Sequence, residues 1–252
     1  AMKLDTVYSL RQELEGYRRQ SAESYLTDKE ITDHLTREAH NRMQEDVRIA
    51  HILVRTTSNT PADTLAAYQK IQTIYQRLQG GEDWNELARA VSEDNDSKNQ
   101  GGDIGYITAM LPNGFYSFET AAYETPVGNY SAPVKSAIGY HIIKILDKRP
   151  ARGEMDVAHI LLRVKEDGSN EAAVKANIDN IYKQVRDGAK FDEFARNYSE
   201  DKSTKDRGGV IGPIAINQYE TAFEDAAFGI ENDGEVSQPV RTTLGWHLIK
   251  RM

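Results

Sequence analysis

The spacing of apolar residues divides the chain into a helical first part and two longer parts of mixed character. Over residues 3–46, apolar positions recur three or four apart, which predicts helices with one buried face. The two predicted stripes are Leu4, Val7, Leu10, Leu14 and Tyr17, then Ile31, Leu35, Ala39 and Met43. Thr27 and Glu30 have capping-box spacing at the start of the second helix. Two helices alone bury too little surface to be stable, so we expect residues 1–45 to form an arm that packs on something else.

After the arm the pattern changes to short strands and helices. Residues 47–54, VRIAHILV, form an apolar run of strand length. Pro61 is placed as the first residue of a helix, whose apolar stripe stops at Gly80-Gly81 and consists of Leu65, Tyr68, Ile71, Tyr75 and Leu78. We then expect a second short helix over 84–91, a glycine-bracketed strand over 101–106, a short helix over 118–123 and two closing strands that end near Lys148.

The same order of segments then repeats. A polar stretch from Asp147 to Glu154 breaks both periodicities and predicts a linker. After it come a strand at 155–162 and two helical stripes, of which the longer is Val174, Ile178, Ile181 and Val185 and the shorter is Phe191, Phe194 and Tyr198. The first-strand histidines His51 and His159 are 108 positions apart. Because solenoid repeats are only about 20–50 residues long, this period predicts two duplicated α+β domains, over 46–149 and 150–252.

Composition limits the functions that fit. A net charge of −8 argues against a nucleic-acid surface, which would show clustered Lys and Arg. No stretch approaches the roughly 18 apolar residues of a membrane span. The chain has no cysteine, which excludes disulfides, thiolate metal sites and a cysteine nucleophile. Cysteine-free chains are common among bacterial envelope proteins, because stray thiols mispair in an oxidising compartment.

Four features occur in both repeats: a first-strand histidine, Ser-Glu-Asp ahead of a double glycine, a helix that begins Phe-Glu, and a last-strand histidine. Taken singly, each has a structural explanation, as a core histidine with a hydrogen-bond partner, a tight turn or a core stripe. A buried histidine needs such a partner, because an unpaired buried polar group costs about 1–3 kcal/mol. The repetition of the whole set in one order favours a shared site that combines the two histidines of each repeat.

Together these motifs resemble the parvulin family of peptidyl-prolyl cis/trans isomerases. In the first repeat the matching segments are IAHILV at 49–54, SED at 92–94, GGDIG at 101–105, FETAAY at 118–123, PVG at 126–128 and GYHII at 139–143. In the second they are AHIL at 158–161, SED at 199–201, GG at 208–209, FEDAAF at 223–228, GE at 234–235 and GWH at 245–247. The resemblance implies a small antiparallel sheet with surrounding helices in each repeat. A tandem pair behind a helical arm resembles the SurA group of periplasmic folding factors.

The resemblance also implies a site in each domain, with two hydrogen-bonded histidines beneath an apolar proline pocket. The implied catalytic positions are His51, Asp94, Ser136 and His141 in the first domain, and His159, Asp201, Thr242 and His247 in the second. The implied pocket phenylalanines are Phe118 and Phe223. The family's methionine on the opposite wall falls on Tyr219 in the second domain, whereas extra residues in the first leave Met110 or Leu111. The copies therefore need not be equally active, and the first is favoured as the more active. No cofactor and no metal are implied.

The leading hypothesis is a peptidyl-prolyl isomerase and folding chaperone for unfolded or proline-containing envelope and outer-membrane polypeptides. The alternative is a holdase in which one or both domains bind peptides without turnover. For the arm, a structural extension is favoured over a client-binding cradle. A metal-dependent or Ser-His hydrolase is poorly supported, because the sequence has neither a ligand-spaced carboxylate motif nor a Gly-x-Ser-x-Gly elbow.

Two further expectations concern specificity and location. The loop after the first strand offers Arg55 alone in the first domain, and Arg163 with Lys165 beside two acidic residues in the second. A phosphoserine dianion calls for several converging cations, so phosphate-directed recognition is not expected. We expect a periplasmic protein; the sequence begins Ala1-Met2 with no signal peptide, so we also expect that a native leader was removed. The oligomeric state is left open.

Overall fold

A computed structural model describes residues 29, 31–58 and 60–252, and these residues form two four-stranded antiparallel sheets with the same strand order. The first sheet has the order β2 (Asp103–Ile107), β1 (Glu45–Arg55), β4 (Gly139–Pro150), β3 (Val134–Ser136). The second has the order β6 (Val210–Ile214), β5 (Met155–Arg163), β8 (Gly245–Arg251), β7 (Val240–Thr242). We call the first sheet with its helices domain 1 and the second domain 2. The expected α+β class, with one small antiparallel sheet in each repeat, is confirmed.

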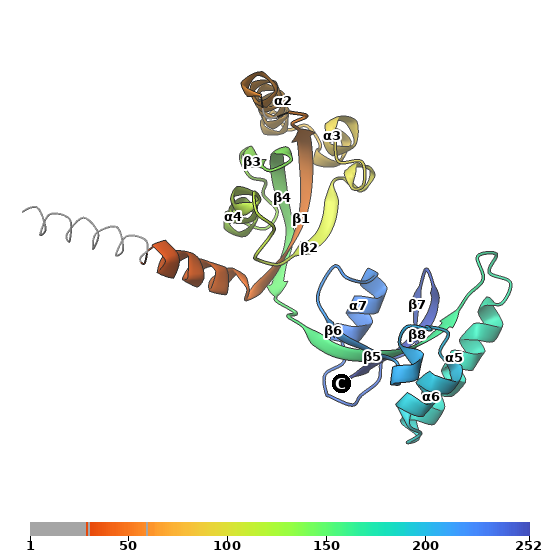
Figure 1. The fold of residues 1–252 in the computed structure, drawn as a ribbon. Helices are drawn as coiled ribbons and strands as arrows, with labels where there is room; N and C mark the ends of the chain where they lie inside the picture. The colour runs from red at the N-terminus through yellow and green to blue at the C-terminus, as the bar shows by residue number, and fades with distance from the viewer. Residues whose placement is uncertain (1–28, 30, 59) are drawn as a thin grey trace, which may run out of the picture.

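Helices cover both faces of each sheet (Figure 1). In domain 1, α2 (Pro61–Gln79) and α3 (Trp84–Val91) pack on one face, and α4 (Tyr116–Glu124) packs on the other. In domain 2, α5 (Glu171–Arg186) and α6 (Phe191–Tyr198) take the first face, and α7 (Thr221–Phe228) takes the second. The short 3₁₀ turns η2 (Lys98–Gln100) and η3 (Lys205–Arg207) precede the edge strands β2 and β6. Both sheets are therefore the middle layer of a three-layer unit.

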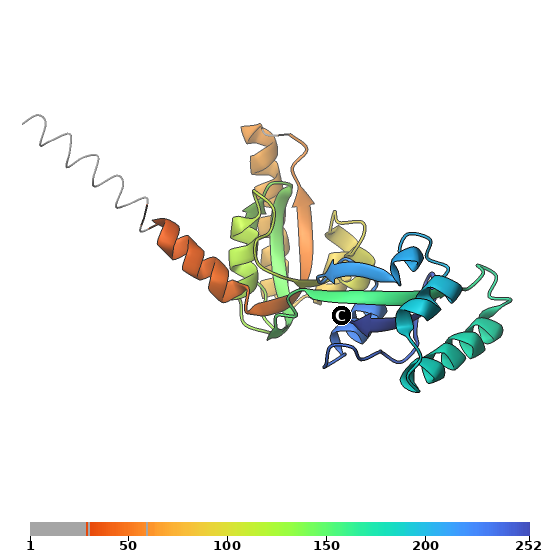
Figure 2. The same cartoon turned by 60° about the horizontal axis from the view of Figure 1, so that its bottom comes forward.

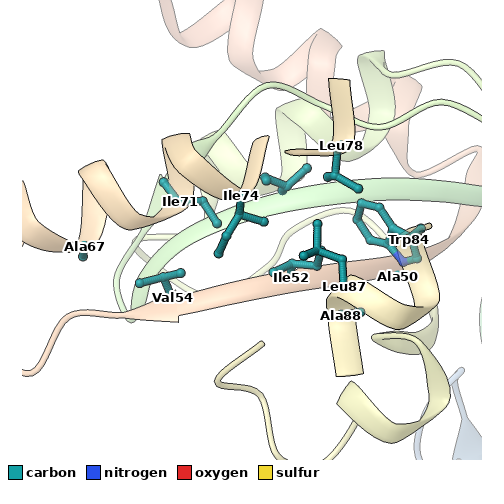
Figure 3. Packing of buried hydrophobic residues seen from close by; sticks show 11 residues of the cluster. Ala50, Ile52, Val54, Ala67, Ile71, Ile74, Leu78, Trp84, Leu87 and Ala88 are labelled. Carbon is teal, nitrogen blue, oxygen red and sulfur yellow. The ribbon is translucent and has the colours of Figure 1, made fainter. Parts of the chain in front are cut away.

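The two buried faces explain why the first strand is an almost unbroken apolar run. Side chains alternate along a strand, so Ala50, Ile52 and Val54 face α2 and α3, where they meet the apolar residues of those helices (Figure 3). Val47 and Ile49 face the opposite way, toward α4. His51 falls in this second set. The alternation alone therefore places the histidine in the layer between the sheet and α4.

The long helix α2 begins and ends as expected, but its first two stripe positions were predicted wrongly. Its N-cap Thr60 accepts a hydrogen bond from the backbone of Asp63, Pro61 is its first residue and it stops before Gly80. Leu65 and Tyr68 are 55% and 41% exposed. The buried face consists of Ala67, Ile71, Ile74 and Leu78, because one helical face repeats at four, three and four residues and Ala67 begins that series. Tyr198, expected in the stripe of α6, is also exposed.

The predicted linker starts too early. Strand β4 continues to Pro150 and pairs with Glu45–Arg48 of β1, after a bulge between Arg48 and Ile49. Buried Asp46 accepts a hydrogen bond of 3.2 Å from Arg149. The sequence there is polar because ion pairs and ring contacts hold this end of the strands together. The connection between the sheets is thus residues 151–154, where Arg152 donates to Asp225 of α7 over 2.6 Å.

The part of the arm that the structure describes includes a helix over residues 31–42, which we call the arm helix and which leads into β1 beside α4 (Figure 2). The predicted stripe is not buried: Ile31, Leu35 and Met43 are 53%, 45% and 53% exposed. The buried residue is Arg42 instead. The first predicted stripe (residues 4–17) and the capping residues Thr27 and Glu30 lie outside the described residues. Within the described residues, the helices are too short or too polar to cross a membrane.

Candidate functional site

Strand register brings the two histidines of each domain together. In domain 1, His51 pairs with Ile143 and Leu53 pairs with His141, so the two imidazoles are diagonal neighbours on the face toward α4. Their Nδ1 atoms are 3.1 Å apart, and the two residues are 6% and 0% exposed. Domain 2 repeats the arrangement with a distance of 3.2 Å between Nδ1 of His159 and Nδ1 of His247. Each buried histidine therefore finds its partner in the other.

Each pair lies in the middle of a hydrogen-bonded chain of four side chains. In domain 1, Nε2 of His51 is 3.1 Å from Oδ2 of Asp94, and Nε2 of His141 is 2.7 Å from Oγ of Ser136. An ionised carboxylate only accepts, so Nε2 of His51 carries a proton and its Nδ1 must accept from His141. Nε2 of His141 then accepts from the Ser136 hydroxyl. All four groups are satisfied with both imidazoles neutral.

Domain 2 contains the same chain with one addition. Nε2 of His159 is 2.9 Å from Oδ2 of Asp201, and Nε2 of His247 is 2.8 Å from Oγ1 of Thr242. Oγ1 of Thr204 also lies 3.2 Å from Nε2 of His159. The same reasoning gives the same tautomers, because the carboxylate again fixes the first proton.

Burial and the hydrogen bonds agree on the charge of these groups. Burial, together with the neighbouring His51, lowers the pKa of His141 to about 3. Burial likewise lowers the pKa of His247 to about 3. Burial also lowers the pKa of His51 and outweighs the opposing effect of Asp94. For Asp94 itself, burial would raise the pKa, but hydrogen bonds from Ser97 and His51 outweigh it and the pKa is lowered. At neutral pH each hydrogen-bonded set of four side chains therefore contains one carboxylate, two neutral imidazoles and one hydroxyl.

A phenylalanine from α4 in domain 1, and from α7 in domain 2, lies against each histidine pair. The ring of Phe118 is 4.9 Å from the ring of His141, with an angle of 76° between the planes. In domain 2, Phe223 and His247 are 5.2 Å apart at 81°. Both phenylalanines are buried, with 3% and 2% of their surface exposed. A bound peptide would therefore meet the partly exposed side chains around them first.

Those surrounding side chains differ between the domains. In domain 1, Leu111 packs with the cluster around Phe118, whereas Met110 is 71% exposed, so Leu111 is the better placed of the two wall candidates. The ring of Phe115 completes this side, 5.8 Å from that of Phe118. In domain 2, Tyr219 stacks on Phe223 at 4.9 Å.

Beside Tyr219, Glu220 occupies the position that matches Phe115, since each lies three residues before the pocket phenylalanine. Its carboxylate accepts from the backbone N–H and the hydroxyl of Thr243. The rim is thus apolar in domain 1, whereas in domain 2 it combines an aromatic ring with a carboxylate.

Sequence reasoning missed Phe115 and the hydroxyls that hold the aspartates. Ser97 donates to Oδ2 of Asp94, and Thr204 donates to Oδ2 of Asp201. Both follow their aspartate by three positions, so a comparison of the two repeats would have found them as Asp-x-x-Ser and Asp-x-x-Thr. Phe115 carried no such signal, because its counterpart is Glu220.

The second glycine of each pair lies against the histidine strand. The backbone of His51 donates to the carbonyl of Gly102 over 2.8 Å, and Gly102 has a φ of 81°. A Cβ at Gly102 would lie 2.1 Å from the carbonyl oxygen of His51. The second glycine of the pair is therefore required by a close backbone approach that fixes the first histidine.

Comparison with known proteins identifies the family of both domains. The family model of the rotamases, described as the PPIC-type PPIase domain, matches residues 51–147 and 159–252. The chain belongs to this family. It therefore contains two parvulin domains, and the resemblance seen in the sequence is confirmed.

Named relatives point to one group within the family. The chain is 33% identical to the Chaperone SurA of Burkholderia lata over 238 residues, which cover 89% of this chain and 51% of the relative. It is 30% identical to the Chaperone SurA of Saccharophagus degradans over 232 residues, which cover 89% and 53%. The chain thus spans about half the length of the curated relatives it matches. The solved structure of the peptidylprolyl isomerase PrsA from Bacillus anthracis is 36% identical, covering 45% of this chain and 46% of that one, with a TM-score of 0.35.

The expected site residues thus meet in space, with one exception. The histidine, acid, hydroxyl and phenylalanine positions of each domain form one connected cluster, and Leu111 and Tyr219 border it, while Met110 faces solvent. Among the described residues, no three histidine, aspartate or glutamate side chains are grouped so as to hold a metal ion. The individual roles of these residues stay predictions.

Proposed function

We propose that this protein is a peptidyl-prolyl cis/trans isomerase and folding chaperone that acts on unfolded, proline-containing polypeptides in the periplasm. The family model and the relatives named Chaperone SurA support the proposal. Its main support is the duplicated chain of acid, two histidines and hydroxyl beneath a buried phenylalanine, with both imidazoles neutral. For clients we propose outer-membrane and other envelope proteins.

The reaction asks for little chemistry. Rotation about an X–Pro bond crosses a barrier of about 18–20 kcal/mol without making or breaking a covalent bond. At the top of the barrier the amide is twisted and has lost its resonance, so it is less polar than the planar amide. An apolar surface that binds the proline ring and excludes water favours this less polar state. In domain 1 we assign that surface to Leu111 and Phe115, supported from below by Phe118.

The histidines do not act as acids or bases in this proposal. Each ring nitrogen already has a partner within the chain of four side chains, and a pKa of about 3 keeps His141 neutral. These four hydrogen-bonded side chains form the polar floor of the site. The contacts of His51, Asp94 and Ser136 hold this floor in one orientation beneath the apolar surface. A fixed dipole needs no reorganisation as the amide twists, which is the electrostatic advantage of a preorganised site.

Domain 2 carries the same floor, so we propose that it binds proline peptides as well. Its catalytic set would be His159, Asp201, Thr242 and His247, with Phe223 and Tyr219 as the apolar contacts. The carboxylate of Glu220 makes the rim less apolar, so we expect weaker binding of an apolar peptide than in domain 1.

A protease-coupled assay on an Ala-Pro peptide tests the isomerase activity directly. The full chain should accelerate the cis-to-trans step, and a chain carrying Phe118→Ala and Phe223→Ala should not. The matched control is Leu65→Ala, an exposed apolar residue near the N-terminal end of α2, which should leave the rate unchanged. If the unaltered chain gives no acceleration, the enzymatic part of the proposal is wrong.

A holdase without turnover is the second candidate, and one observation favours it. Phe118 and Phe223 are closed off from solvent in this structure, so little of the expected pocket is open to a proline ring. A holdase would suppress aggregation of an unfolded outer-membrane protein while showing no isomerase activity. An isomerase that is also a chaperone would show both activities. Its double phenylalanine variant would lose isomerase activity before it lost the ability to suppress aggregation.

A further inference from the structure

The buried guanidinium of Arg42 joins the arm helix to α4, the helix of domain 1 that carries Phe118. Arg42 is 8% exposed, and its guanidinium lies between the rings of Tyr116 and Tyr123, 5.5 and 5.7 Å from their centres. It donates to Oε1 of Glu119 over 3.1 Å and to the hydroxyl of Thr120 over 2.8 Å. Arg42 also pairs with Glu38, four residues before it on the arm helix. The other four partners lie on one face of α4, at spacings of three, one and three residues. This face of α4 is therefore built around a side chain that the arm supplies.

Glu119, one of the two carboxylates that Arg42 contacts, also holds Leu111 in the wall of the proline pocket. Oε2 of Glu119 accepts from the backbone N–H of Leu111 over 2.9 Å, while Oε1 faces Arg42. Glu119 is 6% exposed, and the next residue toward the N-terminus is Phe118. The neighbour of Leu111, Met110, has a φ of 69°, a left-handed conformation that non-glycine residues rarely adopt. The wall loop is thus held in a costly conformation, and Glu119 is one of the groups that fixes it.

Domain 2 holds its wall without an arginine. Glu224 corresponds to Glu119, and its Oε1 accepts from the backbone N–H groups of both Gln218 and Tyr219, over 2.8 and 2.9 Å. Within the described residues this carboxylate makes no ion pair. Arg152 precedes β5 as Arg42 precedes β1, but it reaches Asp225 instead and is more exposed.

We propose that Arg42 is a positioning residue for the proline site of domain 1, so that the arm sets how tightly this domain holds a proline peptide. The inference rests on the proposed function of that site. Within the described residues Arg42 is the one cation that pairs with Glu119, and a buried carboxylate that loses its ion-pair partner must turn toward water. That reorientation moves the acceptor that holds Leu111. In domain 2 the carboxylate of Glu224 holds the wall through two backbone amides and, within the described residues, without an ion pair, so we expect this wall not to depend on Arg42.

The experiment reads each domain separately in the full chain. Phe223→Ala leaves domain 1 as the binding site, and Phe118→Ala leaves domain 2. A fluorescein-labelled Ala-Pro peptide gives Kd by anisotropy, and the protease-coupled assay gives KM and kcat. In the Phe223→Ala background, Arg42→Met should raise Kd and KM roughly tenfold, with kcat within about twofold, because a displaced wall weakens binding. In the Phe118→Ala background the same substitution should change neither Kd nor KM.

Three companion variants separate positioning from general damage. Arg42→Lys keeps the charge but lacks the planar fork, so its Kd should fall between that of the unaltered residue and that of Arg42→Met. Glu119→Gln keeps a carbonyl oxygen for Leu111 but removes the ion pair, and it should raise Kd in the same direction. The matched control Arg152→Met removes an arginine at the corresponding place of domain 2, and it should leave the Kd of that domain unchanged.

Several outcomes would overturn the inference. An unchanged Kd in the Phe223→Ala background, an equal rise in both backgrounds, or a Kd for Arg42→Lys no lower than that for Arg42→Met would each do so. The melting temperature of every variant is measured alongside, and a loss of affinity that follows the melting temperature in Glu119→Gln as well would show a merely structural role. If turnover is absent but Kd shifts as expected, the isomerase proposal fails and the role of Arg42 stands.

Discussion

The two domains share their buried polar chain and differ in the surface above it. The distances between the Nδ1 atoms of the histidines are 3.1 and 3.2 Å, and both chains end in a hydroxyl on the strand before the last. The rim, by contrast, is Leu111 and Phe115 in domain 1, and Tyr219 and Glu220 in domain 2.

The difference shows which part of the site is free to vary. Each member of the buried chain needs the next one, because a single replacement leaves a buried donor or acceptor without a partner. The rim residues contact solvent and satisfy their polar groups locally, as Glu220 does with Thr243. The site can therefore change its substrate preference without losing its floor.

The largest expected effect is on activity. Phe118→Ala should reduce the isomerase rate of the full chain at least tenfold, because domain 1 has the apolar rim and this ring supports it. Phe223→Ala should reduce it by less than half. The protease-coupled assay measures both, and a larger loss from Phe223→Ala would reverse the assignment of the more active domain.

The next effect should be equal in the two domains. His51→Ala and His159→Ala each leave an imidazole N–H and a carboxylate without their buried partner, so each should destabilise its own domain by about 2–5 kcal/mol. Urea unfolding followed by circular dichroism measures the loss. His34→Ala, at a side chain 77% exposed on the arm helix, is the control and should change nothing. A loss of stability confined to one domain would show that the two hydrogen-bonded sets of side chains are not equivalent.

Acid should weaken both domains through the same histidines. The unfolded chain takes up protons as the pH falls through about 6.5, whereas His141 and His247 resist protonation down to about 3, so stability is lost over this interval. At pH 5 the loss from either histidine alone is about 2 kcal/mol relative to pH 7.5. Urea midpoints at both pH values test it. His141→Gln should flatten the dependence in domain 1 only, and a midpoint that rises toward pH 5 would contradict the prediction.

The smallest effect concerns the rim. Glu220→Phe gives domain 2 the residue that domain 1 has at this position, and it should lower the Kd of domain 2 for an Ala-Pro peptide by about threefold to tenfold, through the apolar area added. Anisotropy in the Phe118→Ala background measures it. The reciprocal Phe115→Glu should weaken domain 1 in the Phe223→Ala background. Equal affinities before and after both exchanges would show that the rim does not determine the affinity for the peptide.

Much of the fold and of the polar floor was predictable from the sequence. The apolar runs around His51 and His159 predicted strands, and the repetition of the motifs predicted two copies of one domain. A histidine in such a strand must have a partner, and a second histidine recurs in the last strand of each copy. Local chemistry and repetition together therefore identified the pair.

The rim and the packing of the arm were not predictable in the same way. The choice between Met110 and Leu111 depends on the conformation of a loop, which a hydrogen bond from Leu111 to Glu119 and the neighbouring helix decide. The apolar stripe of the arm helix wrongly predicted its buried face. A stripe shows which face of a helix would gain from burial, but not which neighbour reaches it.

By itself, then, the sequence determined two duplicated α+β domains, the strand of each histidine and the family. These features depend on side-chain periodicity and on motifs that lie close together in the chain. Only the tertiary structure decided that Phe115 borders the site and that Arg42 is buried against Glu119. The contacts of Phe115 with His141 and of Arg42 with Glu119 join elements distant in sequence. A residue pattern does not encode the distance between two surfaces that meet only in the folded chain.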